Sequence, residues 1–321
     1  MSIRYEQSVF FRGYLTEIWL RLWAYFIKGF KNPSWIIMSI LGRFTIIRYA
    51  VVAFLRSSKS KDHQPKNSLS IFRDINVTEI VNSLNQNGLY LGIQLPQNHL
   101  NRIFDFALST TCYGNQNSRL GFYYSEKGRV EKEHGYTFFM AQYYNTSVLC
   151  SEIYELSRDS QLLEIAASYL RAKPIFTGSR LWWTFAVNDE QPYDSNQTIT
   201  FFHYDLDDYA CLRFFFYLTD VDSKSGPHIC VRGSHTSKKL SHVLMPVKRR
   251  GDDEIRNSYG SDNIVTVIGN KGFGFAEDTF CYHKATRPIC RDRLMLQIQF
   301  ATSDYGLHND LKDPSLLRQI A

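Results

Sequence analysis

The sequence lacks the cysteine patterns of a disulfide framework or of a cysteine-based metal site. Its six cysteines are scattered, without a CxxC pair, at Cys112, Cys150, Cys211, Cys230, Cys281 and Cys290. Such cysteines are typical of free, buried thiols in a reducing compartment. The N-terminus also lacks the short apolar stretch and small-residue cleavage site of a signal peptide. Both absences predict a cytoplasmic protein, with membrane association left open by the arm described below.

Most of the chain has no excess of positive charge. The net charge is +6, but residues 1–61 hold ten Lys/Arg against only Glu6 and Glu17, an excess of +8. The remainder therefore has a net charge of −2, which argues against nucleic acid as a partner of the main domain. Internal repeats and low-complexity tracts are absent too, and the length of 321 residues predicts one large domain plus an arm.

Residues 1–61 are predicted to form a basic, amphipathic helical arm. Apolar side chains at helical spacing lie on one face of residues 14–30, at Leu15, Ile18, Trp19, Leu22, Trp23, Phe26 and Phe30. Asn32-Pro33 is expected to end that helix, because proline cannot continue it.

A second apolar stretch, residues 35–55, is interrupted by Arg43 and Arg48. Each arginine would cost about 2.5–3.5 kcal/mol at the centre of a bilayer, so a membrane span is disfavoured. Two alternatives stay open for the arm. Its helices dock on the body of the protein, or residues 14–56 make a peripheral membrane contact.

Residues 68–321 are predicted to form the main domain, after a polar linker at 56–67. Its first part is expected to be rich in helix, with a short helix at 161–171. Eight short β-type runs then build a core at about 178–302, at 180–187, 198–203, 210–218, 228–231, 264–268, 272–276, 281–286 and 293–300. This order predicts an α+β fold: a double-stranded β-helix, of the jelly-roll or cupin-like type, with helices packed on one sheet.

Two of these runs alternate in polarity. In the last run, Leu294, Leu296, Ile298 and Phe300 alternate with Arg293, Met295, Gln297 and Gln299. In the third, Leu212, Phe214, Phe216 and Leu218 alternate with Cys211, Arg213, Phe215 and Tyr217. Because successive side chains of a strand point to opposite faces, the apolar sets are expected to meet the helices and the mixed sets to point inward.

A candidate metal site begins with His203-Tyr204-Asp205 at the end of one β-type run. In extended chain, residues two apart project to the same side, so an imidazole and a carboxylate can bind one ion. His283, 80 residues further on, is the candidate third ligand. Two histidines and one carboxylate on one face of an octahedron are typical of oxygen-activating Fe(II).

The His-x-Asp pattern alone is weak evidence, because His308-Asn309-Asp310 has the same form. That second copy lies in a polar tail and is assigned no role. His228, His235 and His242 are expected to be structural or surface residues.

Longer stretches around the triad resemble the phytanoyl-CoA dioxygenase family of Fe(II)/2-oxoglutarate oxygenases. The sequence reads HYD at 203–205 and LTDVDSKSGPHICVRGSH at 218–235, similar to the family's two strands joined by a turn and ended by GSH. GFGFAEDTFCYHKA (272–285) and RDRLMLQIQF (291–300) follow in the family's order. The segment 157–174 resembles the helix that precedes the family's core. The resemblance covers residues of about 80–305.

The resemblance implies a double-stranded β-helix in which His203, Asp205 and His283 bind Fe(II). It also implies 2-oxoglutarate and O2 as co-substrates, with ascorbate as an optional reductant. The family places an arginine about ten residues after the distal histidine, where its planar fork binds the far carboxylate of 2-oxoglutarate. Arg293 matches that position, and Arg291 is the alternative.

Two positions depart from the family's pattern. Many members have serine two residues after the distal histidine. This chain has Ala285 there, so the neighbouring Thr286 becomes the candidate second contact to the co-substrate. Phe215 stands where many members have tryptophan, and is the candidate aromatic wall of the co-substrate site.

The implied function is hydroxylation of an unactivated C–H bond in a small-molecule or lipid-like substrate, with release of succinate and CO2. A non-catalytic relative that binds metal or ligand is one alternative. A cupin-like metal enzyme of other chemistry, such as an isomerase, is a second. A membrane-surface protein acting through its arm is a third. The sequence predicts no particular oligomeric state.

Three further features have two interpretations each. Arg213 binds an acidic group of the substrate or is structural. Trp182 and Trp183 line the pocket or, as we favour, lie in the core. The basic segment 236–262 is a lid over the site or, as we slightly favour, a solvated loop.

Overall fold

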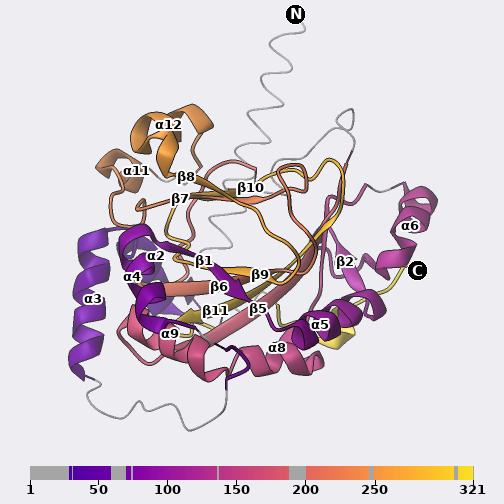
Figure 1. Cartoon of the computed structure of the whole chain (residues 1–321), viewed down its shortest axis with the longest axis horizontal. Coiled ribbons are helices and arrows are strands. Elements are labelled where there is room, and N and C mark those ends of the chain that lie inside the picture. The colour runs from indigo at the N-terminus through magenta and orange to yellow at the C-terminus, as the bar shows by residue number, and fades with distance from the viewer. Residues whose placement is uncertain are drawn as a thin grey trace, which may run out of the picture.

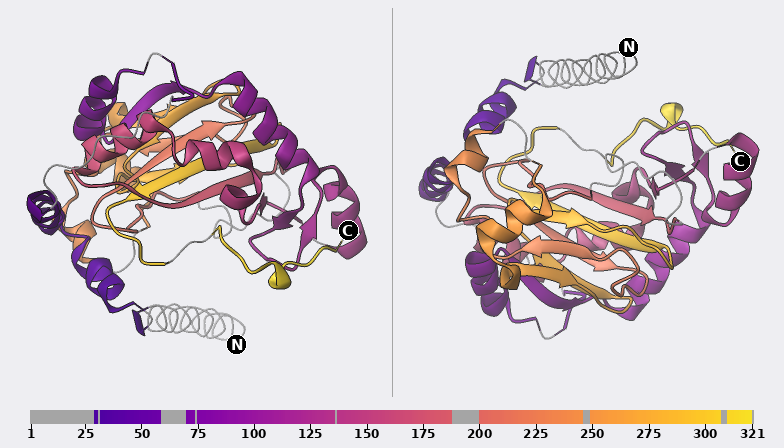
Figure 2. Two further views of the ribbon diagram at one scale, coloured as in Figure 1. Left: turned by 90° about the horizontal axis from the view of Figure 1, so that it is seen from below. Right: turned by 90° about the horizontal axis from the view of Figure 1, so that it is seen from above.

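The computed structural model describes residues 29–30, 32–58, 70–73, 75–135, 137–187, 200–245, 249–306 and 310–320. Two antiparallel β-sheets form the centre of the molecule, and helices cover the outer face of the larger one (Figures 1 and 2). This is the predicted α+β architecture, a double-stranded β-helix with helices on one sheet.

The larger sheet has eight strands in the order β1-β9-β6-β11-β5-β4-β2-β3. In chain order they are β1 (Leu89–Gln94), β2 (Cys112–Gly114), β3 (Gly121–Phe122), β4 (Met140–Gln142), β5 (Ile175–Thr184), β6 (Cys211–Tyr217), β9 (Phe273–Glu277) and β11 (Arg293–Ala301). The long strand β11 lies between β5 and β6, so that Gln297 stands opposite Arg180 on one side and Phe215 on the other.

The smaller sheet has the order β10-β7-β8. Its strands are β7 (His228–Val231), β8 (Ile264–Val267) and β10 (His283–Ala285). In Figure 1 these strands lie above the larger sheet, and residues of both sheets line one cavity.

Helices and short 3₁₀ turns connect the strands. The helices of the body are α4 (Val77–Asn87), α5 (Gln97–Ser109), α6 (Lys127–His134), α7 (Thr146–Leu149), α8 (Ser151–Leu156), α9 (Ser160–Leu170), α11 (Leu240–Leu244) and α12 (Asp252–Tyr259). The 3₁₀ turns are η1 (Tyr124–Glu126), η2 (Ser261–Asn263) and η3 (Pro314–Leu316).

Two helices behind the sheet have clear sequence signals at their ends. The side chain of Asn76 accepts a hydrogen bond from the Glu79 N–H at 3.1 Å and caps the start of α4. Gly88, at φ 69°, ends the same helix in the left-handed conformation that glycine adopts without strain. Asp159 caps α9 by accepting from the backbone of Gln161 and Leu162, which confirms the predicted helix there.

The main hydrophobic core fills the space between this helical layer and the larger sheet. Ile80, Leu84, Ile103, Ile153, Leu162 and Ile165 of the helices are buried against Leu212, Phe214, Phe216, Leu294, Leu296, Ile298 and Phe300 of the strands. The purely apolar sets of both alternating strands therefore face the helices, as predicted. The side chains on the other face of β11, namely Arg293, Met295, Gln297 and Gln299, line the cavity between the sheets.

Two helices precede the body, α2 (Pro33–Leu41) and α3 (Thr45–Ser58). Pro33 occupies the first turn of α2, where its missing N–H breaks no helical bond. Trp35 and Met38 of α2 are buried in a second apolar cluster with Phe202, Tyr204 and Tyr282. Through these residues α2 packs on the body. None of the helices in the described ranges has the length and hydrophobicity needed to cross a bilayer.

The other predictions for the arm and linker fall largely outside the described residues. Of the helix predicted at 14–30, only residues 29–30 are described, and they are helical. The linker predicted at 56–67 overlaps the end of α3, and residues 59–69 lie outside the description. All six cysteines are free thiols, and five of them are buried, in agreement with the sequence.

Three predictions about elements were wrong. The part of the chain expected to be rich in helix also contributes β1 to β4 to the larger sheet. The strand expected at 198–203 is not formed by its described residues, where Phe202 and His203 make only isolated bridges. The segment 236–262, predicted as a lid or loop, contains α11 and α12.

Candidate metal centre

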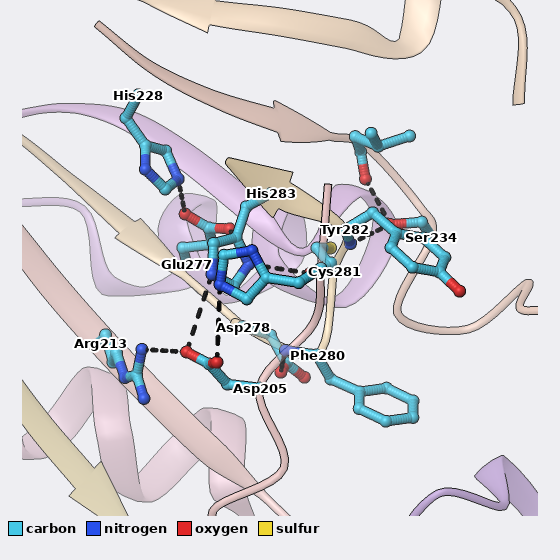
Figure 3. A network of polar contacts seen from close by, with 12 residues as sticks. Asp205, Arg213, His228, Ser234, Glu277, Asp278, Phe280, Cys281, Tyr282 and His283 are labelled. Atoms are coloured by element: carbon cyan, nitrogen blue, oxygen red, sulfur yellow. Dashed lines mark hydrogen bonds and ion pairs between the residues drawn. The ribbon is translucent and has the colours of Figure 1, made fainter. Parts of the chain in front are cut away.

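His203, Asp205 and His283 come together at one point of the fold. Their possible ligand atoms all lie within 4.8 Å of one another. Asp205 Oδ1 is 3.8 Å from His203 Nε2. Asp205 Oδ2 is 3.7 Å from His283 Nε2 (Figure 3). The two imidazole rings are 4.3 Å apart between centroids.

Backbone pairing closes the gap of 80 residues between the two histidines. The N–H of His203 donates to the carbonyl of His283 at 3.0 Å, and the N–H of His283 donates back at 2.8 Å. Asp205 is held in turn by its own N–H, which donates to Thr279 O at 2.8 Å. The three candidate ligands are therefore positioned by main-chain bonds, independently of any ion.

The second nitrogen of each imidazole has a backbone partner. His203 Nδ1 lies 3.2 Å from Phe201 O, and His283 Nδ1 lies 3.0 Å from Cys281 O. A carbonyl oxygen can only accept, so both Nδ1 atoms carry the proton and both Nε2 atoms present a lone pair toward Asp205. This arrangement of a backbone acceptor behind the ring is typical of metal-binding histidines.

Both histidines are held in the neutral form that a metal requires. Burial, followed by the neighbouring His203, lowers the pKa of His283 to about 4. Burial also lowers the pKa of His203, although Asp205 opposes that effect. Two neutral imidazoles and one carboxylate are a suitable donor set for Fe(II).

The carboxylate of Asp205 has a cationic neighbour in the large sheet. Arg213, on β6, donates to Asp205 Oδ2 (Figure 3). It also donates to Asp207, and its Nε donates to Gln299 at 2.8 Å. All three guanidinium nitrogens of Arg213 are therefore engaged by protein groups. The structural interpretation of this residue is supported, and it holds Asp205 in place.

A buried carboxylate beside the triad was not identified from the sequence. Glu277, on β9, is fully buried, and its Oε2 lies 2.7 Å from His228 Nε2 (Figure 3). Burial by itself would raise the pKa of Glu277, but His228 lowers it below its ordinary value. Glu277 Oε1 is also 3.7 Å from His283 Nδ1. His228 and Glu277 thus form a fixed polar pair next to the distal ligand. The only sequence signal was that His228 lies in a β-type run and Glu277 directly follows one.

The back of the ligand segments is packed by Lys238. Its ammonium nitrogen lies 4.4 Å from the ring centroid of Tyr204, 4.5 Å from that of Phe280 and 4.0 Å from that of Tyr282. Tyr204 lies between two candidate ligands and Tyr282 precedes the third, so this cation–π contact joins both segments. Burial lowers the pKa of Lys238 to about 7.

Lys238 belongs to the segment 236–262, which lies behind the site. The N–H of Arg250 donates to Phe202 O at 2.8 Å, on the same side. None of the described residues of the segment lines the cavity. This placement contradicts the interpretation of the segment as a lid over the site.

A cavity of about 500 Å³ lies in front of the triad. Its lining includes the three candidate ligands, His228, and inward-facing residues of the large sheet: Gln142, Arg180, Trp182, Thr184, Arg213, Phe215, Arg293, Met295, Gln297 and Gln299. The mixed faces of β6 and β11 therefore point into a polar cavity, as their alternation predicted. Trp182 lines the cavity, whereas its neighbour Trp183 is buried in the main core.

Arg293 lies fully buried at the start of β11 and lines the cavity. It donates to Gly226 O and, at 3.0 Å, to Thr184 Oγ1. Arg291 is instead half exposed and forms an ion pair with Asp222 at 3.2 Å. Of the two arginines considered from the sequence, only Arg293 reaches the cavity. Arg287 donates to Val187 O at 2.8 Å.

The two remaining candidate contacts differ in position. Phe215 lines the cavity and stacks on His228, with ring centroids 5.6 Å apart. The hydroxyl of Thr286 donates to Pro227 O at 2.7 Å, and Thr286 is not among the residues that line the cavity. Ala285 lines it instead.

The second His-x-Asp motif has a different environment. Asp310 is buried and accepts from the N–H and hydroxyl of Ser179, at 3.0 and 3.3 Å. His308 lies outside the described residues. Asp310 holds the C-terminal segment against β5, and it belongs to no cluster of metal-ligand type within the described ranges.

Comparison with known proteins finds similar structures but no similar sequence. No family model matches the chain, and no curated protein matches it. AviO1 from Streptomyces viridochromogenes Tue57 is 13% identical with a TM-score of 0.46, over 71% of this chain and 96% of that one. SnoN, described as an epimerase and solved with Fe3+, alpha ketoglutarate and nogalamycin RO, is 13% identical with a TM-score of 0.47, over 70% and 82%.

A third similar structure is EctD from S. alaskensis, solved with 2-oxoglutarate and 5-hydroxyectoine. It is 10% identical with a TM-score of 0.45, over 75% of this chain and 84% of that one. Similarity at this level does not identify a reaction. The function of this chain is therefore argued from its own residues.

Proposed function

We propose that this protein is an Fe(II)- and 2-oxoglutarate-dependent dioxygenase of the phytanoyl-CoA dioxygenase family. In this proposal it hydroxylates an unactivated C–H bond of a small-molecule or lipid-like substrate. The observation that supports it best is the geometry of His203, Asp205 and His283. These residues present two Nε2 atoms and a carboxylate to one point at the edge of a polar cavity.

The residues fit the metal and the co-substrate that the proposal requires. His203, Asp205 and His283 would hold Fe(II) on one face and leave the cavity side open. When bound, Fe(II) with 2-oxoglutarate and O2 supplies the oxidising chemistry, and the co-substrate leaves as succinate and CO2. The donor set is chemically suited to iron because it combines imidazole nitrogen with carboxylate oxygen.

The protein's own groups would bind and orient the reactants. Arg293 lines the cavity and would bind the distal carboxylate of 2-oxoglutarate, with Thr184 and Gly226 fixing the plane of its guanidinium. Phe215 supplies an apolar wall of the cavity and stacks on His228. Thr286 remains a proposed second contact, which requires its hydroxyl to leave Pro227 O.

Succinate formation tests the proposal. Wild-type protein loaded with Fe(II) and 2-oxoglutarate is expected to form succinate on exposure to air, and ascorbate is expected to sustain turnover. Asp205→Ala is expected to reduce succinate to the background level, because the metal loses its only carboxylate ligand.

The same assay separates the alternatives. Bound Fe(II) and 2-oxoglutarate without succinate release under any candidate substrate would favour a non-catalytic relative. Bound metal without affinity for 2-oxoglutarate would indicate a cupin-like enzyme of other chemistry, such as an isomerase.

We further propose that α2 and α3 make a peripheral contact with an anionic lipid surface. Helix α3 has an inverted arrangement: Arg48 is only 8% exposed, while Ile46 and Phe54 are 84% and 73% exposed. Buried Arg48 pairs with Asp278 at 3.7 Å. The other large apolar side chains exposed on these helices are Ile36, Ile37, Ile40 and Tyr49.

An apolar surface of this kind needs an apolar partner. The excess of +8 within residues 1–61 favours anionic lipid over a second copy of the same basic arm. A lipid surface would also bring amphiphilic substrates near the protein.

A further inference from the structure

The substrate end of the cavity contains an arginine that the mechanism above does not use. Arg180 lies on β5, directly opposite Gln297 of β11, and its side chain lines the cavity with Trp182. The guanidinium carbon of Arg180 lies 5.1 Å from the centroid of the Trp182 ring. Stacking of this kind holds the planar guanidinium in one orientation without using its N–H donors.

Arg180 has no anionic partner within the ranges that the structure describes. No carboxylate there forms a salt bridge with it, and no group accepts a hydrogen bond from it. Arg213, by contrast, has Asp205, Asp207 and Gln299. Burial, followed by the positive charge of Arg213, lowers the pKa of Arg180. An enclosed guanidinium without a counter-charge is costly, and proteins retain such groups chiefly where a ligand completes them.

Asp205 is the carboxylate whose charge acts on Arg180. In the proposed enzyme Asp205 is a metal ligand, and it also accepts from Arg213. Its charge is therefore already shared between two cations, and it does not neutralise a third. The cavity thus keeps an unsatisfied positive group on the Asp205 side of the metal.

Arg180 and Arg293 enter the cavity from different positions along the sheet. Thr184, which stands opposite Arg293, follows Arg180 by four residues along β5. Four residues of extended strand span roughly 13 Å. This separation of the two backbone positions favours different ligands for the two arginines. We therefore expect the anion that Arg180 would bind to differ from the co-substrate.

We propose that Arg180 is the anchor for an oxyanion group, a carboxylate or a phosphate, on the substrate. The proposal rests on the function proposed above and specifies its substrate class. Gln142 of β4 stands opposite Trp182 and lines the same cavity, where its amide offers a further donor. Arg213, which the sequence suggested for this role, is occupied by protein carboxylates.

Binding of simple anions tests this proposal. Calorimetric titrations use anaerobic protein that is saturated with Fe(II) and 2-oxoglutarate, so that the metal and Arg293 are already occupied. The probes are pentanoate, inorganic phosphate and the uncharged pentanamide. We expect one of the two anions to bind at least about tenfold more tightly than pentanamide, because charge-assisted bonds to the guanidinium are lost with the amide. The anion that binds more tightly identifies the oxyanion class.

The variants are Arg180→Gln and Arg180→Lys, with Arg102→Gln as the control. Arg102 is an exposed arginine of α5 that pairs with Glu152, away from the cavity. We expect Arg180→Gln to weaken anion binding at least about tenfold, Arg180→Lys to weaken it less, and Arg102→Gln to leave it unchanged. Equal anion binding by wild type and Arg180→Gln would overturn the proposal, as would a loaded wild type that binds neither anion.

A prior titration with 2-oxoglutarate is made on every variant. If the wild type fails to bind 2-oxoglutarate, the proposed function itself fails. If Arg180→Gln binds 2-oxoglutarate as the wild type does, the variant is folded and its anion binding is interpretable. A marked loss of 2-oxoglutarate binding in Arg180→Gln would assign Arg180 to the co-substrate and so also overturn the proposal.

Discussion

At the scale of single residues, the three arginines that line the cavity, Arg180, Arg213 and Arg293, have different partners. These partners indicate the role of each. Arg213 is saturated by carboxylates and an amide, so it can only hold Asp205 in position. Arg293 lines the cavity and donates to Gly226 O and Thr184 Oγ1. Arg180 stacks on Trp182. One arginine is therefore structural, and two are suited to bind anions from solution.

Replacement of Arg293 tests the co-substrate assignment. Lysine keeps the charge but loses the planar fork, so Arg293→Lys is expected to raise the KM for 2-oxoglutarate about tenfold or more with little change in iron affinity. The exposed Arg291 is the matched control, because it was the alternative in the sequence and pairs with Asp222. A KM raised by Arg291→Lys and unchanged in Arg293→Lys would reverse the assignment.

The triad was predictable at this scale because strand periodicity and the order of motifs are local properties. Arg180, His228 and Glu277 were not predictable as site residues. The contact of His228 with Glu277 depends on how a strand of the small sheet faces a strand of the large one. The absence of a partner for Arg180 depends on the register of β5 and β11. A linear sequence does not give the distance between residues that meet only across sheets.

At the scale of elements, strands β5 to β11 overlap predicted β-type runs, whereas β1 to β4 were not predicted. Strands β5, β6, β9 and β11 contain enough residues for alternation or β-branched composition to be visible. Strands β2, β3 and β4 have only two or three residues, and no periodicity can be read from so few. Two helices in the segment 236–262 were missed for the same reason, because α11 has five residues and α12 eight.

The exposed face of α2 and α3 is tested by sedimentation with lipid vesicles. The double variant Ile46→Ser/Phe54→Ser is expected to bind vesicles of phosphatidylglycerol at least about tenfold more weakly than wild type, since it removes two exposed apolar side chains. Wild-type binding is expected to fall at high salt and to be weak on neutral phosphatidylcholine, because the basic arm contributes.

The matched control is Val148→Ser/Leu149→Ser, which removes two exposed apolar residues of α7 at 74% and 59% exposure. This variant is expected to bind vesicles as wild type does. A wild type that does not sediment with anionic vesicles would contradict the membrane proposal. So would a dimer that dissociates in Ile46→Ser/Phe54→Ser, since the face would then serve a second copy of the chain.

At the scale of the whole molecule, the two sheets contribute differently to the core and to the candidate site. The large sheet buries one face against helices and presents the other to the cavity. The small sheet contributes His283 and His228, and its pairing with residue 203 brings two distant ligands together. Residues behind the ligands, including Lys238, pack against the ligand segments from outside. The fold therefore brings the three candidate ligands together through its own backbone pairing.

Equilibrium binding of Fe(II) under anaerobic conditions tests this central claim most directly. We expect wild type to bind one Fe(II) per chain, and the double variant His203→Ala/His283→Ala to lose that tight binding while retaining its thermal unfolding transition. His308→Ala, in the second His-x-Asp motif, serves as the control and is expected to bind one Fe(II) with unchanged affinity. One tightly bound Fe(II) per chain in the double variant, or its loss in His308→Ala alone, would contradict the assignment of the metal centre.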